Sequence, residues 1–232
     1  MFITKKLLKE KGACGAGARI FIDRFPEGAE YQTILDALAA ENNYEWASWL
    51  MDRFGTTDTA MEVNEINIDA SLFFAGKIIV KGTLEIARRL LAGDGIKAGG
   101  GIKAGDGIKA GRGIKAGWSI KAGRGIRAGW GIEAGDDIEA GWGIEAGWGI
   151  EAGDDIDAGW GIKAGEDIKA GRGIGAGDDI EAGDDFGVYA GLKIRIGKKK
   201  EYATIRAKEK PKNIICGEFV EGTEENLIIE GA

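Results

Sequence analysis

Two consecutive eighteen-residue blocks decide the fold: IRAGWGIEAGDDIEAGWG (residues 126–143) and IEAGWGIEAGDDIDAGWG (residues 144–161), which agree at 16 of 18 positions. Each block contains three six-residue units of the form I-x-A-G-x-G/D. Working outward, isoleucine recurs at every sixth position from Ile96 to Ile180, fifteen times, and each is followed by alanine two residues later and glycine three residues later. Self-similarity at a fixed short period is typical of a solenoid in which each unit stacks on its neighbours.

The hexad alternates as a short β-strand does. Residues one and three of a strand face one side and residue two faces the other, so isoleucine and alanine point into a core and the residue between them points outward. The G-x-G/D segment then forms a corner, where we expect glycine to supply a positive φ. Because the blocks repeat every three hexads, the sequence predicts a mainly β fold, a three-sided parallel β-helix in which each turn takes eighteen residues.

Segments of different character flank the repeat. Residues 1–60 carry apolar residues at helical spacing and predict a small α-helical N-terminal cap domain. Residues 61–197 form the predicted solenoid, whose register slips by two residues before Val188 and is expected to continue at Ile194. Residues 198–232 alternate like strands and predict a short β C-terminal cap. Solenoid ends expose unpaired strand edges, so we expect these two segments to cover them.

A turn made of three hexads aligns the corner residues in columns along the rod. Two columns place an arginine below two tryptophans, and a third places a tryptophan below two aspartates. A narrow Ile/Ala core cannot hold five tryptophans, which leaves three interpretations: a self-stacking ladder, a protein interface with itself or a foreign partner, or a stacking site for sugars or bases. The predicted contact residues of these columns are Arg112, Arg124, Trp118, Trp130, Trp142, Trp148 and Trp160.

The charged positions leave further alternatives open. Strand-centre residues are basic from Lys97 to Arg127 and acidic from Glu133 to Asp157. Such bands suit a solvated surface or a matching partner, because two antiparallel rods would set basic bands against acidic ones. We also expect one corner to bring together four carboxylates, those of Asp136, Asp137, Asp154 and Asp155. This cluster suits a solvated patch, a calcium site or an imitation of DNA phosphates.

The composition excludes several classes of function. The chain has no histidine, which removes the commonest general base, the commonest metal ligand and every Ser-His or Cys-His nucleophile. We therefore expect no enzymatic activity and no cofactor. The net charge of −7 disfavours direct nucleic-acid binding. No segment is apolar enough for a signal peptide or a membrane span, and we expect a cytoplasmic protein with no membrane contact.

The repeat resembles the hexapeptide-repeat, three-sided β-helix proteins in its period and turn size. In that family the small residue precedes the large aliphatic residue by two positions, whereas here it follows by two. The acyltransferases of the family rely on a catalytic histidine, so the resemblance implies the architecture and not their chemistry.

The whole layout is also similar to uncharacterised bacterial and phage-borne proteins. These join an LKxxGACxxGxxxF-type head, here Leu8 to Phe21, to I-x-A-G repeats and an AKEKPKNII-type tail, here Ala207 to Ile215. The tryptophan columns and charge bands predict a non-enzymatic protein-interaction module. Together with the acidic corner, the resemblance suggests an inhibitor of a host nucleic-acid enzyme or defence complex, with DNA mimicry as one candidate route. The alternatives are a structural homo-oligomer assembled through the tryptophan columns and a calcium-binding solenoid.

Overall fold

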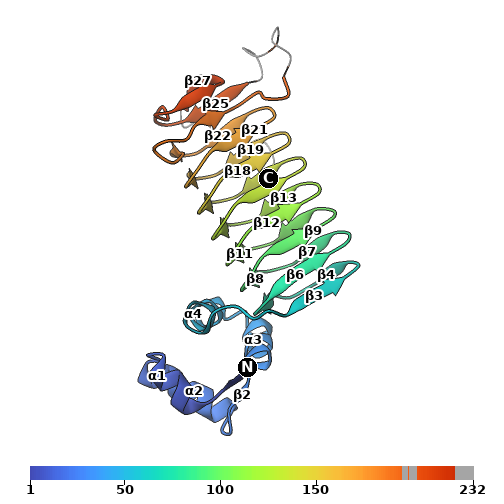
Figure 1. Cartoon of the computed structure of the whole chain (residues 1–232), viewed down its shortest axis with the longest axis vertical. Helices are drawn as coiled ribbons and strands as arrows, with labels where there is room; N and C mark the ends of the chain where they lie inside the picture. Colours follow the sequence, from blue (N-terminus) through green and yellow to red (C-terminus); the bar gives the residue numbers. More distant parts are fainter. Residues whose placement is uncertain (195–197, 199–202, 223–232) are drawn as a thin grey trace.

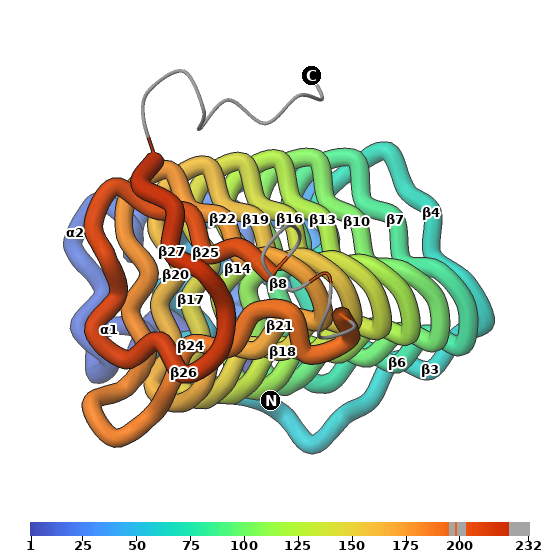
Figure 2. Tube along the Cα trace, turned by 90° about the horizontal axis from the view of Figure 1, so that it is seen from above, coloured from blue at the N-terminus to red at the C-terminus, as the bar shows by residue number. Residues whose placement is uncertain are grey.

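A computed structural model describes residues 1–194, 198 and 203–222. Four helices form a head at one end of a long rod of parallel strands, and the last strands of the chain lie at the other end (Figure 1). Successive turns of the rod stack directly behind one another when the rod is viewed from above (Figure 2). The fold is therefore mainly β, as the repeat predicts.

The head begins with a short antiparallel pair, β1 (Phe2–Ile3) and β2 (Ala29–Glu30). Side chains cap three of its helices: the Thr4 hydroxyl accepts the N–H of Leu7, the Cys14 Sγ accepts the N–H of Gly17, and the Asn43 side-chain carbonyl accepts the N–H of Trp46. The four helices are α1 (Lys5–Glu10), α2 (Gly15–Arg24), α3 (Tyr31–Ala40) and α4 (Tyr44–Phe54).

Three parallel sheets form the sides of the rod. Sheet 1 contains nine strands: β3 (Ala60–Val63), β6 (Lys77–Val80), β9 (Ile96–Ala98), β12 (Ile114–Ala116), β15 (Ile132–Ala134), β18 (Ile150–Ala152), β21 (Ile168–Ala170), β24 (Val188–Tyr189) and β26 (Ile214–Cys216). Sheet 2 also contains nine: β4 (Ile66–Ile68), β7 (Leu84–Ile86), β10 (Ile102–Ala104), β13 (Ile120–Ala122), β16 (Ile138–Ala140), β19 (Ile156–Ala158), β22 (Ile174–Ala176), β25 (Thr204–Ala207) and β27 (Glu218–Glu221). Sheet 3 contains seven: β5 (Leu72–Phe74), β8 (Leu90–Ala92), β11 (Ile108–Ala110), β14 (Ile126–Ala128), β17 (Ile144–Ala146), β20 (Ile162–Ala164) and β23 (Ile180–Glu181).

The strand register confirms the predicted turn of eighteen residues. Ile114 pairs with Ile132 and Ile132 pairs with Ile150, and the same offset holds through the repeat on all three sheets. Isoleucines and alanines of the repeat are buried, and the residue between them faces outward. The burial pattern is thus the one predicted from strand alternation, and it repeats on every side of the rod.

The corner glycines have a different role from the predicted one. The glycines with a positive φ in the described chain all lie outside the I-x-A-G units, so the expected left-handed corner is wrong. The glycine after each alanine instead sits directly on the backbone of the turn below: a Cβ on Gly117 would overlap the carbonyl oxygen of Gly99. The sixth position is roomier, since a Cβ on Gly113 would lie 3.3 Å from the nearest carbonyl oxygen. This difference explains why aspartate replaces glycine at the sixth position, as at Asp137.

The C-terminal strands extend the coil. The predicted β cap is present as β25, β26 and β27, which pair in parallel with strands of sheets 1 and 2. Val188 pairs with Ile168, which confirms the slip of two residues. The expected continuation at Ile194 is wrong, because Ile194 lies in a bend after a left-handed Gly191, and Ile205 takes the place on sheet 2 instead. Ile196, the other residue of that expected unit, lies outside the described residues.

The helical head packs on the outer face of sheet 3. Phe73 and Leu91 occupy outward positions that are charged elsewhere in the repeat, and both are buried with the apolar side chains of α3 and α4. The head therefore covers the sheet 3 side of the first turns, and Ile68 at the end of the coil keeps 36% of its surface exposed. The predicted covering of the coil end is incomplete for that reason.

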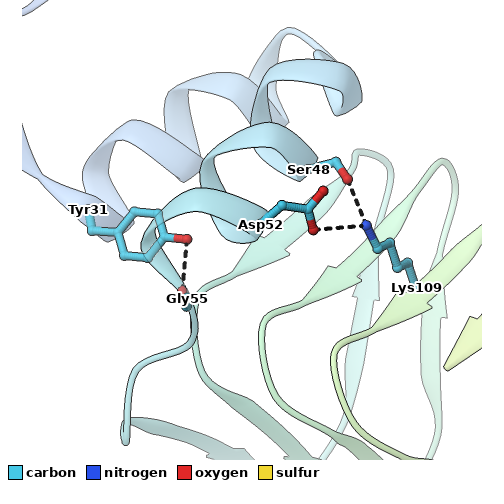
Figure 3. Close-up of polar contacts among 5 residues, drawn as sticks. All are labelled: Tyr31, Ser48, Asp52, Gly55 and Lys109. Atoms are coloured by element: carbon cyan, nitrogen blue, oxygen red, sulfur yellow. Dashed lines mark hydrogen bonds and ion pairs between the residues drawn. The ribbon is translucent and has the colours of Figure 1, made fainter. Parts of the chain in front are cut away.

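Polar contacts fix the same junction (Figure 3). Lys109 Nζ on β11 donates to Ser48 Oγ at 2.8 Å and lies 3.4 Å from Asp52 Oδ1, both on α4. The hydroxyl of Tyr31 donates to the carbonyl oxygen of Gly55 at 3.2 Å, and burial together with the charge of Asp52 raises the pKa of this phenol. No helix in the described ranges has the length and apolar character needed to cross a membrane.

Candidate interaction surface

The first column runs along the corner between sheets 3 and 1. Its tryptophans Trp130 and Trp148 stack face to face, with ring centroids 4.9 Å apart and an interplanar angle of 2°. The guanidinium of Arg112 lies 4.9 Å from the centroid of Trp130 and closes the lower face of the stack. Arg112 Nη1 is in turn 3.4 Å from Asp94 Oδ2, and Glu166 follows Trp148 above the stack.

The second column repeats this arrangement at the corner between sheets 2 and 3. Trp142 and Trp160 stack at 5.2 Å and 4°, and Arg124 lies 5.2 Å from the centroid of Trp142. Arg124 Nε is 3.4 Å from Asp106 Oδ1 below. Above the stack, Asp178 accepts a hydrogen bond of 2.5 Å from Lys208. The two columns are thus near copies built from different turns of the coil.

The backbone of the coil creates these stacks. Equivalent corner residues of successive turns are hydrogen-bonded, for example from the N–H of Trp160 to the carbonyl of Trp142 at 3.1 Å. This places like side chains one strand spacing apart, about 4.8 Å, which suits stacked aromatic rings. Each lower ring lies between the arginine and the upper ring, whereas Trp148 and Trp160 have a ring partner on one face only, and all four rings keep exposed surface. The exposed fractions are 41% for Trp130 and 49% for Trp148.

The third column, between sheets 1 and 2, is different. Trp118 stands between Gly100 below and Asp136 above, and it has no ring or cation partner among the described side chains. It is the most exposed of the five corner tryptophans, at 62%. The structure thus brings four of the predicted tryptophans together in pairs and leaves Trp118 alone.

The acidic corner on this third column is mostly engaged within the molecule. Asp137 Oδ1 accepts the N–H of Asp155, and Asp155 Oδ1 accepts the N–H of Gly173 at 2.7 Å. Arg172 lies 3.5 Å from Asp155 and 4.0 Å from Asp154. Within the part of the chain that is described, no three Asp, Glu, Cys or His side chains lie where they could hold one metal ion. Asp137, Asp154 and Asp155 therefore have partners within the chain.

Each column borders a groove, the first with Arg112 and Trp130 and the second with Arg124, Trp142 and Trp160. The groove between the first column and the outward side chains of sheet 1 has a volume of about 510 Å³, and its lining includes Lys97, Lys115 and Glu151. The groove between the second column and sheet 3 has a volume of about 540 Å³. It reaches the head, where the Arg89 guanidinium stacks on Tyr44 at 4.1 Å. Reasoning from the sequence missed both grooves, because each combines a corner with a neighbouring side of the rod.

Ion pairs join the predicted charge bands along the rod. At the boundary between the bands, Lys115 Nζ is 2.5 Å from Glu133 and Lys121 Nζ is 2.7 Å from Glu139. Arg127 and Glu145 form the equivalent pair on sheet 3. The hydrogen bond that Lys121 donates to Glu139 raises the pKa of Lys121. Because these side chains are about half exposed, such pairs contribute at most about 1 kcal/mol each.

One carboxyl group on sheet 2 has a raised pKa. Burial, together with the negative charges of Asp155, Glu139 and Asp137, raises the pKa of Asp157 to about 6. Glu139 is its strand neighbour on the turn below, and Gly175 is its neighbour on the turn above. Asp157 therefore carries a partial proton near neutral pH.

Comparison with known proteins covers the head alone. Residues 1–56 match the family described as the YdhT N-terminal domain, a span that includes all four helices and ends before the first strand of the coil. No curated protein and no solved structure matches the chain. The functional interpretation of the solenoid therefore depends on its own geometry.

Proposed function

We propose that the protein is a non-enzymatic interaction module, a rigid solenoid that binds a protein partner through its Arg–Trp–Trp columns. The observation that carries the proposal is the pair of stacked columns, with four partly exposed indoles held beside two arginines. Tryptophan and arginine are the residues most enriched in the energetic centres of protein interfaces. The stacking also fixes the rings in advance, so that little side-chain entropy is lost on binding.

The geometry favours a protein over a sugar or a nucleobase. A sugar or base stacks on the flat face of an indole, and three of the four ring faces in each column are covered by the neighbouring ring or by Arg112 or Arg124. Only the upper faces of Trp148 and Trp160 have no such cover in the described chain. The open ring edges, the Nε1–H groups and the groove walls can instead contact the varied side chains of a protein surface.

For the partner we propose a host nucleic-acid enzyme or a defence complex that the protein inhibits. The support for this setting is the resemblance of the layout to phage-borne proteins and the negative charge of the chain. DNA mimicry has weaker support than tryptophan-mediated binding, because Asp137 and Asp155 accept backbone hydrogen bonds and Arg172 offsets part of the charge of that corner.

Affinity capture with matched variants tests the function. The wild-type chain and a Trp142→Ala/Trp160→Ala variant are immobilised and exposed to the same bacterial lysate, with Trp118→Ala as the control for loss of an exposed indole. We expect a protein that is retained by wild type and by the Trp118→Ala variant and is lost from the double variant. Equal capture by all three chains, or no capture by any, would contradict the proposal.

A further inference from the structure

The outward side chains of sheet 1 follow an antisymmetric order of charge along the rod. From the head towards the other end, Lys97 and Lys115 are followed by Glu133 and Glu151, each one turn further on. A two-fold axis perpendicular to the rod, placed between Lys115 and Glu133, would exchange Lys115 with Glu133 and Lys97 with Glu151. Lys169 on the next turn hydrogen-bonds Asp167 at 2.6 Å and so has its own partner.

The inner and outer members of this row differ in their contacts. Lys115 and Glu133 form an ion pair within the chain. Lys97 and Glu151 make no ion pair with any residue that the structure describes. They lie three turns apart, about 14 Å at the usual strand spacing, and cannot meet within one molecule. Glu151 is the strand neighbour of Lys169 and attracts its charge, but Lys169 is hydrogen-bonded to Asp167. Because neither Lys97 nor Glu151 forms an ion pair in the described chain, both can contact another molecule.

The other two sides of the rod do not offer this arrangement. On sheet 3 the head buries Phe73 and Leu91, and Lys109 is held by α4. On sheet 2 the outer cation Lys103 already pairs with Glu85 at 3.2 Å. The outer carboxyl group on sheet 2 belongs to Asp157, which is partly buried. Only sheet 1 combines an open face with an unpaired cation and an unpaired carboxylate at matched distances from one centre, among the faces described.

We propose that the occupant of the sheet 1 face is a second copy of this chain, bound antiparallel about a two-fold axis. Lys97 of each copy faces Glu151 of the other, so the same contact occurs twice. A parallel pair would place each charge opposite its own copy and would be repelled. The interface is self-complementary in charge, because the order Lys97, Lys115, Glu133, Glu151 sets each lysine of one copy opposite a glutamate of the other.

Apolar surface for the contact comes from the two corners that border sheet 1. The first column contributes the edges of Trp130 and Trp148, and the third column contributes Trp118, whose large exposed area has no partner in the chain. Burial of these indoles supplies the hydrophobic part of an interface whose charged pairs alone would be weak. The second column, with Trp142 and Trp160, stays open to a foreign partner, so the proposal does not depend on the proposed function.

Sedimentation equilibrium with charge-swap variants tests the antiparallel pair. We expect reversible dimerisation of the wild type. Lys97→Glu and Glu151→Lys each turn both symmetry-related contacts from attraction to repulsion and should weaken the dimer Kd by about tenfold or more. An equimolar mixture of the two variants, and the double variant Lys97→Glu/Glu151→Lys, restore opposite charges at both contacts and should return the Kd towards the wild-type value.

Lys103→Glu is the matched control, because it changes the net charge equally on sheet 2 and should leave the Kd unchanged. A wild type that stays monomeric up to about 100 μM would overturn the proposal, as would single variants that the mixture fails to rescue, or a Lys103→Glu variant that is weakened as much. Circular dichroism of each variant confirms that it is folded. A monomeric wild type that still captures a foreign protein would refute this inference alone, and a dimeric wild type that captures no foreign protein would refute the proposed function alone.

Discussion

The glycine that follows each alanine of the repeat has no room for a side chain. Its Cα hydrogen faces the carbonyl oxygen of the glycine one turn below, as Gly117 faces Gly99 and Gly135 faces Gly117. A left-handed conformation would have tolerated asparagine, whereas direct backbone contact tolerates no Cβ at all. Close approach of the backbone one turn below therefore explains why the position after alanine is always glycine. At the sixth position the neighbouring carbonyl oxygen is farther away, and aspartate can replace glycine there.

Two alanine substitutions in neighbouring corners separate these positions. In Gly117→Ala the new methyl group overlaps the Gly99 carbonyl, so the turns must move apart and we expect a loss of about 2–4 kcal/mol in unfolding free energy. In Gly113→Ala the methyl group lies 3.3 Å from the Gly131 carbonyl, and we expect a loss below about 1 kcal/mol. Thermal melts followed by circular dichroism measure both, and equal destabilisation would show that conformational freedom, rather than contact, selects glycine.

The Asp157 carboxyl group predicts a pH effect on stability. Its pKa of about 6 in the folded chain exceeds the ordinary value of 3.8, so the folded state binds more protons than the unfolded state between these values. Stability from this group is therefore present below about pH 4 and is lost as the pH rises through 6. Asp157→Asn removes the ionised form, and we expect it to stabilise the chain by about 2 kcal/mol at pH 7.

To test Asp157→Asn, the free energy of unfolding of the variant is compared with that of the wild type at pH values near 4 and 7. Asp167 and Glu181 have pKa values lowered by hydrogen bonds from Lys169 and Lys163, so acid destabilises both chains through these groups. The difference between the chains cancels this common loss. It should be clear at pH 7 and disappear near pH 4. A difference that is the same at both pH values would indicate a packing effect and contradict the raised pKa.

The corner columns show how successive turns of the coil repeat the same side-chain contact. Trp130, Trp148 and Arg112 are not close in sequence, yet the offset of one full turn between successive members places them in direct register. Sequence reasoning found these columns because the turn length follows from the match between residues 126–143 and 144–161. It could not decide between a structural ladder and an interface, since stacking covers the ring faces and leaves the edges exposed, and the two roles coexist in the same side chains.

Two tryptophan substitutions measure how much the stacked columns contribute to the stability of the fold. Trp148→Ala removes a stacked ring, and we expect the free energy of unfolding to fall by about 0.5–1.5 kcal/mol. Trp118→Ala removes a ring that has no aromatic or cationic partner in the described chain, and we expect a change within about 0.5 kcal/mol. Chemical denaturation of both variants checks the difference. Equal effects would mean that the stack does not stabilise the rod and that its arrangement serves binding alone.

The whole molecule follows from its sequence to different degrees along the chain. The three sides, the turn length and the buried isoleucines could be predicted, because every unit repeats the same local pattern. The position of the head on the rod could not be predicted, because it depends on Phe73 and Leu91. These apolar residues stand at outward positions that are charged in most other turns, and only the structure shows that both lie on sheet 3 beneath the head. The predicted path beyond Gly191 was also wrong, because this glycine adopts a left-handed conformation and the six-residue period ends there.

Replacement of Leu91 by lysine tests how the head is held on the rod. Leu91 occupies the outward position that carries lysine in many other turns, so a lysine there suits the coil, but beneath the head it would bury an unpaired charge. We therefore expect Leu91→Lys to release the head while the strands remain folded, with proteolysis between α4 and β3 faster by about tenfold or more and little change in the β signal. Ile79→Lys is the matched control, because Ile79 holds the same outward position on sheet 1, partly exposed and outside the cluster that the head buries. Unchanged protection in Leu91→Lys would contradict docking through sheet 3, and loss of the whole β signal would show that head and coil unfold as one unit.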